Sequence, residues 1–186
     1  MPSKIPTLVI VDMQECMADP AAGARNNPDA EDNIAALLAA WRDAGASVVH
    51  VRHMSRDPQS GFWPGRPGAA FQHRFLPRAG EHVIEKNVPD AFANSALERW
   101  LHLRGVKALV FAGVSTNISV ESTVRSAGNL GFITQVPSDA TFAFAKTDYA
   151  GTPRSADEVH AMSLSNLHGE YATVTTTAAL IGQLAP

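Results

Sequence analysis

Three side chains of reactive type stand where a folded chain could bring them together. Asp12 ends an apolar run, Lys86 follows a second short apolar run, and Ser119 lies just after a glycine-led turn that enters a helical pattern. A carboxylate and an ammonium in one cleft can move a proton to or from a third group. A hydroxyl near a helix N-terminus lies where backbone N–H groups and the helix dipole stabilise developing negative charge. Together the three residues predict proton-transfer chemistry beside an oxyanion site.

Each of these residues also has an ordinary structural explanation. An acid such as Asp12 often caps a helix or lies in a loop, and most lysines are solvated surface charges. A serine in the first turn of a helix commonly packs or caps, as Ser119 could. The prediction of a site therefore depends on the combination of the three residues.

The hydrophobic pattern alternates strands with helices along the chain. Apolar, β-branched runs predict strands at residues 7–11, 47–52, 83–84, 108–112, 132–136 and 172–175, and helical spacing predicts helices at 29–44, 95–103, 118–130, 156–167 and 177–184. This alternation predicts one α/β domain over residues 1–186, with a parallel sheet of six strands covered by helices on both faces. Ligands of such sheets bind at the carboxyl ends of the strands, where the three reactive residues fall.

A long loop is predicted over residues 54–79, which are rich in Pro and Gly and show no clear period. Loops of this length commonly form binding walls, so we expect this one to set the substrate. We predict that Phe62, Trp63 and Phe142 form an apolar wall of the pocket. Gln14 and Asn87 complete the expected substrate-binding residues.

Composition excludes several classes of function. The chain has 15 Lys and Arg against 18 Asp and Glu and no basic run, so we expect no nucleic-acid partner. The one cysteine, Cys16, excludes an intrachain disulfide and favours a reducing, cytoplasmic location. The apolar run before Asp12 is too short for a signal peptide or a membrane span, so we expect no membrane association.

Four stretches of the chain occur in the order of the motifs of a known superfamily. The stretches LVIVDMQ, HVRH, VIEKNVPDAF and FAGVSTNISVESTVRSAGNLGF begin at residues 8, 50, 83 and 111. As an ordered set they resemble the isochorismatase-like, or cysteine hydrolase, superfamily over about residues 7–180. The resemblance implies a three-layer, Rossmann-like αβα sandwich with a six-stranded, mainly parallel sheet. It also implies an Asp, Lys and Cys triad in the amidase members, and Asp12 and Lys86 match its first two positions.

The third position departs from the amidase pattern G-V-x-T-x-x-C-V, because Ser119 stands where those members have cysteine. A hydroxyl is a much poorer nucleophile than a thiol near neutral pH and needs a base to take its proton. Three interpretations stay open. Ser119 is a nucleophile activated by Asp12, or it replaces a natural cysteine so as to trap substrate, or no covalent nucleophile is used. The last resembles isochorismatases proper, in which the acid protonates an enol ether, the lysine orients or stabilises charge, and Ser119 would only bind.

The resemblance carries further expectations about the turn and the assembly. It implies a cis peptide between Val114 and Ser115, which would direct the backbone N–H groups of Ser115 and Ser119 toward a shared oxyanion site. It also implies a homo-oligomer, either a dimer or a tetramer.

Other candidate groups carry less weight. Cys16 is an alternative nucleophile, but it lies in the loop after Asp12 and not in the turn, and free cysteines are more often small buried hydrophobes. Nicotinamidase relatives bind zinc through an acid and two histidines, and His50, His53, Asp57 and His73 do not reproduce that spacing, so we expect no metal and no cofactor. We expect His160 to be structural or to lie at a subunit contact.

The leading hypothesis is a hydrolase that cleaves a C–N bond, an amide or a ureide, in a small molecule. Asp12 would act as the base, Lys86 as electrostatic support, and Ser119 or a cysteine at its position as the nucleophile. Two alternatives stay open: enol-ether hydrolysis by Asp12 as an acid, and a catalytically silent small-molecule binding protein.

Overall fold

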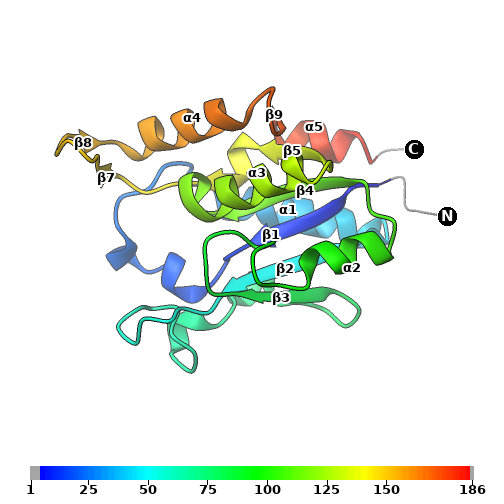
Figure 1. The fold of residues 1–186 in the computed structure, drawn as a ribbon, viewed down its shortest axis with the longest axis horizontal. Helices are drawn as coiled ribbons and strands as arrows, with labels where there is room; N and C mark the ends of the chain where they lie inside the picture. The colour runs from blue at the N-terminus through cyan, green and yellow to red at the C-terminus, as the bar shows by residue number, and fades with distance from the viewer. Residues whose placement is uncertain (1–4, 185–186) are drawn as a thin grey trace.

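The structure is a computed structural model that describes residues 5–184. Its central sheet confirms the six predicted parallel strands, in the spatial order β3, β2, β1, β4, β5, β9, and adds a short strand, β6, that pairs with β4 (Figure 1). All five residues of β1 are buried, as a continuous apolar run requires when both faces of a sheet are covered. The strands are β1 Thr7–Val11, β2 Val48–His53, β3 His82–Lys86, β4 Ala108–Val114, β5 Ile133–Pro137, β6 Thr141–Phe142 and β9 Thr173–Thr175.

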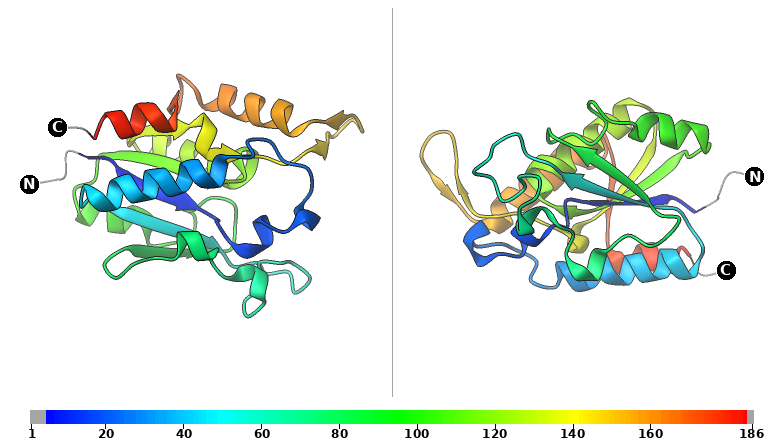
Figure 2. Two further views of the ribbon diagram at one scale, coloured as in Figure 1. Left: turned by 180° about the vertical axis from the view of Figure 1, so that it is seen from behind. Right: turned by 90° about the horizontal axis from the view of Figure 1, so that it is seen from below.

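Helices cover both faces of the sheet, which confirms the predicted three layers. Helices α1 (Ala30–Asp43) and α5 (Thr177–Gly182) lie on one face (Figure 2). The opposite face carries α2 (Leu97–Leu103), α3 (Glu121–Asn129) and α4 (Ala156–Leu167). Alternate residues of β1 divide between the two cores. Leu8 and Ile10 pack under α1, and Val9 and Val11 pack under α2 and α3, as the two-residue period of a strand requires.

Two of the helices begin differently from the prediction. Helix α2 starts at Leu97 and not at Ser95, because the Ser95 hydroxyl accepts a hydrogen bond from the Leu97 N–H and so lies before the helix. The helix expected from residue 118 begins as a π-helical turn, η5 (Thr116–Val120), and becomes α3 at Glu121. The predicted bounds of the other helices agree with the structure within about two residues.

The loop segments contain short elements that the sequence pattern did not predict. Strands β7 (Lys146–Thr147) and β8 (Pro153–Arg154) form a separate antiparallel hairpin that projects at the left of Figure 1, just before α4. The long segment 54–79 has neither a strand nor an α-helix, as expected, and is folded by hydrogen-bonded turns. The remaining short helices are η1 Glu15–Met17, η2 Pro20–Ala22, η3 Pro67–Ala69, η4 His73–Phe75 and η6 Ser138–Ala140.

The order of the strands reverses between β1 and β4, which is where sheets of this kind bind ligands. Gly113 pairs with Val11 across these two strands. At Gly113, φ is +125°, and a Cβ there would lie 2.1 Å from the Val11 carbonyl oxygen. Only glycine therefore permits the two strands to approach each other next to Asp12. Among residues 5–184, no helix has both the length and the apolar character to span a membrane.

Candidate active site

The structure brings the three predicted reactive side chains into direct contact. Lys86 Nζ donates a hydrogen bond to Asp12 Oδ2 at 2.6 Å and another to Ser119 Oγ at 3.2 Å. Asp12 follows β1, Lys86 is the last residue of β3, and Ser119 belongs to the turn after β4. All three are buried, and Ser119 is the most exposed at 9%. Parallel strands thus bring together side chains that are distant in the sequence.

His53 is a fourth member of this group that the sequence analysis did not assign to the site. Its Nδ1 lies 3.3 Å from Lys86 Nζ, and its ring packs edge-on against Phe62 at 5.2 Å between centroids. His53 is paired with Lys86 in the register of β2 and β3. Each of the three N–H groups of the ammonium therefore has an acceptor, from Asp12, Ser119 and His53. The HVRH stretch could indicate this role only if the register of the two strands were known.

Burial governs the protonation of the site. It raises the pKa of Asp12, and the charge and hydrogen bond of Lys86 offset part of that rise. Burial and the charge of Lys86 lower the pKa of His53 to about 4. His53 is therefore neutral near pH 7, and its Nδ1 can accept a hydrogen bond from Lys86.

The backbone and the free oxygen of Asp12 both distinguish this residue. Its φ is +53°, which is a left-handed conformation. Residues other than glycine rarely adopt this conformation, and those that do are frequently at functional sites. Its N–H donates to the Val51 carbonyl at 2.9 Å, which holds the end of β1 against β2. Oδ1 is buried and has no hydrogen-bond partner among residues 5–184. Buried acceptors are normally hydrogen-bonded, so an unpaired one requires an explanation. Here Oδ1 is free to accept from a ligand or a reacting group.

The turn that carries Ser119 is held by α4. The peptide between Val114 and Ser115 is cis, as the resemblance implied. Thr116 Oγ1 lies 2.8 Å from His160 Nδ1, and Ser163 Oγ donates to the Thr116 carbonyl at 3.0 Å. His160 is buried against this turn. That Val114, Ser115 and Ser119 form an oxyanion site stays a prediction.

A pocket of about 600 Å³ opens beside Lys86, and two of the predicted substrate-binding residues line it. Trp63 and Asn87 lie in its wall, whereas Phe62 contacts the His53 ring. Phe142 does not line this pocket: it is fully buried in the core beneath α1, with the Arg25 guanidinium 3.8 Å from its ring centre. The complete lining is Met54, Ser55, Arg56, Trp63, Pro64, Glu85, Lys86, Asn87 and Asn94.

Gln14 uses its side chain to tie together the backbone around the site. Its Nε2 donates to the carbonyls of His53 and Ala69, both at 2.9 Å, and its Oε1 accepts from the His53 N–H at 2.7 Å. Both donors and one acceptor position of the amide are thus occupied by protein. Gln14 fixes the end of β2 and the long loop relative to Asp12, and its predicted contact with substrate stays untested.

The other reactive groups do not join this cluster. Burial raises the pKa of Cys16 to about 11, so its thiol stays protonated near neutral pH and is a poor nucleophile. His50 is bound to Glu81 at 2.8 Å on the α1 side of the sheet. Among residues 5–184, no group of three His, Cys, Asp or Glu side chains is arranged to hold a metal ion.

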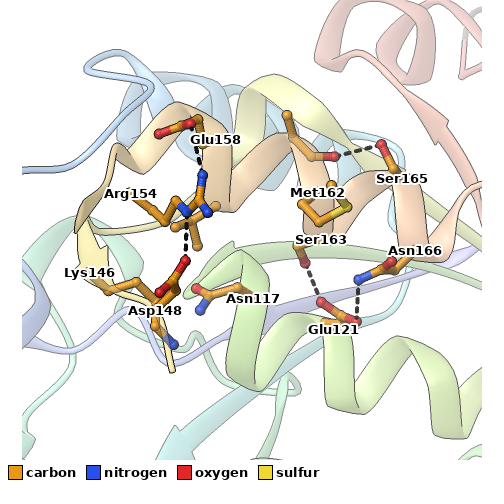
Figure 3. Close-up of a pocket in the computed structure, with 12 residues that line it drawn as sticks. Asn117, Glu121, Lys146, Asp148, Arg154, Glu158, Met162, Ser163, Ser165 and Asn166 are labelled. Atoms are coloured by element: carbon orange, nitrogen blue, oxygen red, sulfur yellow. Dashed lines mark hydrogen bonds and ion pairs between the residues drawn. The ribbon is translucent and has the colours of Figure 1, made fainter. Parts of the chain in front are cut away.

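A second pocket, of about 680 Å³, lies between η5, α4 and the β7–β8 hairpin (Figure 3). Its charged groups are largely satisfied by one another. Arg154 bridges Asp148 at 2.9 Å and Glu158 at 3.7 Å, and Glu121 accepts from Ser163 at 2.7 Å. Its lining includes none of the three catalytic candidates, whereas the pocket of about 600 Å³ includes Lys86 but neither Asp12 nor Ser119.

Comparison with known proteins agrees with this geometry. The isochorismatase domain model matches residues 6–179. The uncharacterized isochorismatase family protein YrdC of Bacillus subtilis is 40% identical over 174 residues, covering 94% of this chain and 93% of its own. A solved structure of an isochorismatase-family protein from Chromobacterium violaceum has 49% identity and a TM-score of 0.94, covering 99% of this chain and 95% of its own. Maleamate amidohydrolase of Pseudomonas putida is 33% identical over 147 residues, which are 70% of this chain and 69% of that protein. On the strength of these matches and of the fold, the chain belongs to the isochorismatase family of hydrolases.

Proposed function

We propose that this hydrolase cleaves the C–N bond of a small amide or ureide through Asp12, Lys86 and Ser119. The observation that carries the proposal is the contact of one ammonium, Lys86 Nζ, with both Asp12 Oδ2 and Ser119 Oγ, at 2.6 and 3.2 Å. Such a constellation joins a base, a hydroxyl and a fixed positive charge in one buried place. The relative named maleamate amidohydrolase supports an amide as the substrate class.

The hydrogen-bond directions favour Ser119 as the nucleophile. An ammonium only donates hydrogen bonds, so Ser119 Oγ accepts from Lys86 and its own proton is free to be donated. The free acceptor nearby is Asp12 Oδ1, on the carboxylate bound to the same ammonium. Asp12 would take the proton as Ser119 Oγ forms a bond to the carbonyl carbon, and would then return it to the nitrogen as the C–N bond breaks. Water, deprotonated by Asp12, would hydrolyse the resulting ester.

The negative charge of the tetrahedral intermediate needs its own stabilisation. The backbone N–H groups of Ser115 and Ser119, at the turn before α3, are the proposed donors, with Lys86 as the nearest full positive charge. Lys86 remains beside the carboxylate throughout, so it also compensates the charge of Asp12 after the proton returns to the leaving nitrogen.

Ammonia release tests the proposal. A panel of small amides and ureides is incubated with the wild-type chain and with Ser119→Cys, Ser119→Ala and Asp12→Asn. We expect turnover by the first two proteins, and a fall of about 10³-fold or more for the last two. Ser165→Ala is a matched control, because its exposed hydroxyl on α4 only bonds the Ala161 carbonyl. Failure of both wild type and Ser119→Cys to release ammonia, with circular dichroism unchanged, would remove the amidohydrolase proposal.

A second function, enol-ether hydrolysis without a covalent intermediate, is favoured by a different observation. Burial raises the pKa of Asp12, and its Oδ1 is unpaired, which suits a carboxylic acid that donates a proton. In that reaction Ser119→Ala keeps most of the activity, whereas Asp12→Asn loses it. Loss of activity in both variants therefore separates the covalent mechanism from the acid mechanism. Melting shifts on ligand binding without turnover of either substrate class would instead indicate a silent binding protein.

A further inference from the structure

The ammonium of Lys86 has three hydrogens and three neighbouring acceptors. Its Nζ lies 2.6 Å from Asp12 Oδ2, 3.2 Å from Ser119 Oγ and 3.3 Å from His53 Nδ1. An ammonium carries three donors and no acceptor, so these three contacts use all of its hydrogens. No N–H of Lys86 is then left for the second carboxylate oxygen, Asp12 Oδ1, which has no hydrogen-bond partner among residues 5–184.

The two ring nitrogens of His53 have different roles. Burial and the charge of Lys86 lower the pKa of His53 to about 4, so the ring carries one proton near pH 7. A hydrogen bond with the backbone of Val88 acts in the opposite direction and raises this pKa, as a bond donated by the ring does. Because Nδ1 faces Lys86, the nitrogen that donates to Val88 is Nε2. Nδ1 is therefore unprotonated and acts as an acceptor.

The fold fixes His53 in this orientation. His53 and Lys86 are partners in the parallel register of β2 and β3, so their side chains leave the sheet on the same face. Gln14 binds both backbone groups of His53, since its Nε2 donates to the carbonyl at 2.9 Å and its Oε1 accepts from the N–H at 2.7 Å. Phe62 packs edge-on against the imidazole at 5.2 Å between ring centroids. The acceptor for Lys86 is thus held in place by the protein itself.

We propose that His53 is a positioning residue that accepts one N–H of Lys86 and thereby keeps Asp12 Oδ1 free to act as the base. This inference rests on the proposed function, in which Oδ1 takes the proton of Ser119. Without an acceptor at residue 53, the third N–H of the buried ammonium would be unpaired, which is costly, so the ammonium would turn toward Oδ1. An oxygen that already accepts a hydrogen bond from an ammonium is a weaker base.

The turnover test separates the acceptor of His53 from its ring. His53→Asn keeps an acceptor, because the asparagine side-chain oxygen stands as many bonds from Cα as Nδ1 does, whereas His53→Phe keeps a ring against Phe62 and loses the acceptor. With an amide that the wild-type chain hydrolyses, we expect His53→Phe to lower kcat by about 10- to 100-fold at a nearly constant KM, and His53→Asn to stay within about 3-fold of wild type. His73→Phe is the matched control, since this histidine is exposed on the long loop. Equal kcat in His53→Phe and His53→Asn, or a lower kcat in His53→Asn, would overturn the inference.

Nuclear magnetic resonance tests the contact without turnover, so it separates this inference from the proposed function. In the wild-type chain near pH 7, nitrogen spectra should show the ring proton of His53 on Nε2 and none on Nδ1. A titration followed by the carboxyl carbon signal should give a lower pKa for Asp12 in His53→Phe than in wild type, because Oδ1 gains a hydrogen bond, and an unchanged pKa in His53→Asn. These results support the positioning role even if no amide is hydrolysed. A proton on Nδ1, or the same pKa of Asp12 in His53→Phe and in wild type, overturns it even if amides are hydrolysed.

Discussion

Lys86 is the residue that holds the site together, because its ammonium contacts Asp12, Ser119 and His53. Burying a charged pair carries a large desolvation penalty, which the pair recovers only if both partners stay in place. Removing one partner leaves the other charge buried and uncompensated. The arrangement that we propose for catalysis thus makes the local stability depend on the protonation of Asp12.

Lys86→Met should therefore destabilise the chain in a pH-dependent way. Without the ammonium, burial raises the pKa of Asp12 further. A carboxyl whose folded-state pKa lies above the unfolded-state value contributes stability at pH below the unfolded-state value and loses it as the pH rises through the folded-state pKa. We expect a loss of about 3 kcal/mol near pH 8 and a smaller loss near pH 5, measured by urea denaturation. In Asp12→Asn/Lys86→Met this pH dependence should vanish, and a loss that is the same at both pH values in the single variant would contradict the explanation.

At the scale of elements, Glu81 joins the long loop to two layers of the fold. Its carboxylate accepts from Arg42 of α1 at 2.7 and 2.8 Å, from the Arg78 N–H at 2.7 Å and from His50 of β2 at 2.8 Å. Burial acts to raise the pKa of Glu81, but these hydrogen bonds outweigh it and lower the pKa from 4.5 to about 2. Glu81 is therefore ionised near neutral pH, and its carboxylate binds the end of the loop to α1 and β2.

Glu81→Gln should lower the free energy of unfolding by about 2 to 3 kcal/mol near pH 7. A depressed carboxyl pKa contributes stability above the unfolded-state pKa and loses it as the pH falls toward the folded-state value, so the difference from wild type should shrink below about pH 4.5. Urea denaturation near pH 7 and near pH 4 measures both effects. Glu85→Gln is the matched control: its pair with Arg52 is largely exposed, and we expect a change of less than about 1 kcal/mol.

The sequence predicted elements better than it predicted the relations between them. The strands and helices could be read because buried parallel strands are continuous apolar runs and the helices keep a 3.6-residue period. The contact of Asp12, Lys86 and Ser119 could be expected because the carboxyl ends of parallel strands share one edge of the sheet. The register that places His53 opposite Lys86 depends on pairing between distant segments, so His53 was missed. Phe142 was placed in the wall on its type alone, and the β6 pairing instead buries it in the core.

At the scale of the whole molecule, the two cores share the strands of one sheet and no linker separates them within residues 5–184. We therefore predict that the chain unfolds as a single cooperative unit. Trp41 lies in the core beneath α1, and Trp100 packs against the core on the opposite face. Single-tryptophan variants that keep one or the other should give the same urea midpoint by fluorescence, and far-UV circular dichroism should give that midpoint too. Different midpoints would contradict the prediction of one domain over residues 1–186. Residues 1–4 and 185–186 of that predicted domain lie outside the described part of the chain.

A homodimer or homotetramer stays a prediction from the family resemblance. Sedimentation velocity should give a single species of two or four chains, and the unfolding midpoint should rise with protein concentration, because association stabilises the folded state by mass action. A monomer at all concentrations would contradict it.

Residues 69–72 are hydrogen-bonded directly to the chain just after Asp12. Gln72 N–H donates to the Met13 carbonyl, Glu15 N–H donates to the Ala70 carbonyl, and the Gln14 side-chain amide donates to the Ala69 carbonyl. Residues 55–66, which bring Arg56 and Trp63 to the pocket, are folded by turns of their own, with Ser60 donating to Asp57 and Arg66 to Trp63. The long loop thus has one part that is bound to the chain near Asp12 and one part that is folded by its own turns. Replacing residues 55–66 with the segment of another family member should change the substrate preference and leave the position of Asp12 unchanged. Replacing residues 69–72 in the same way should displace Asp12.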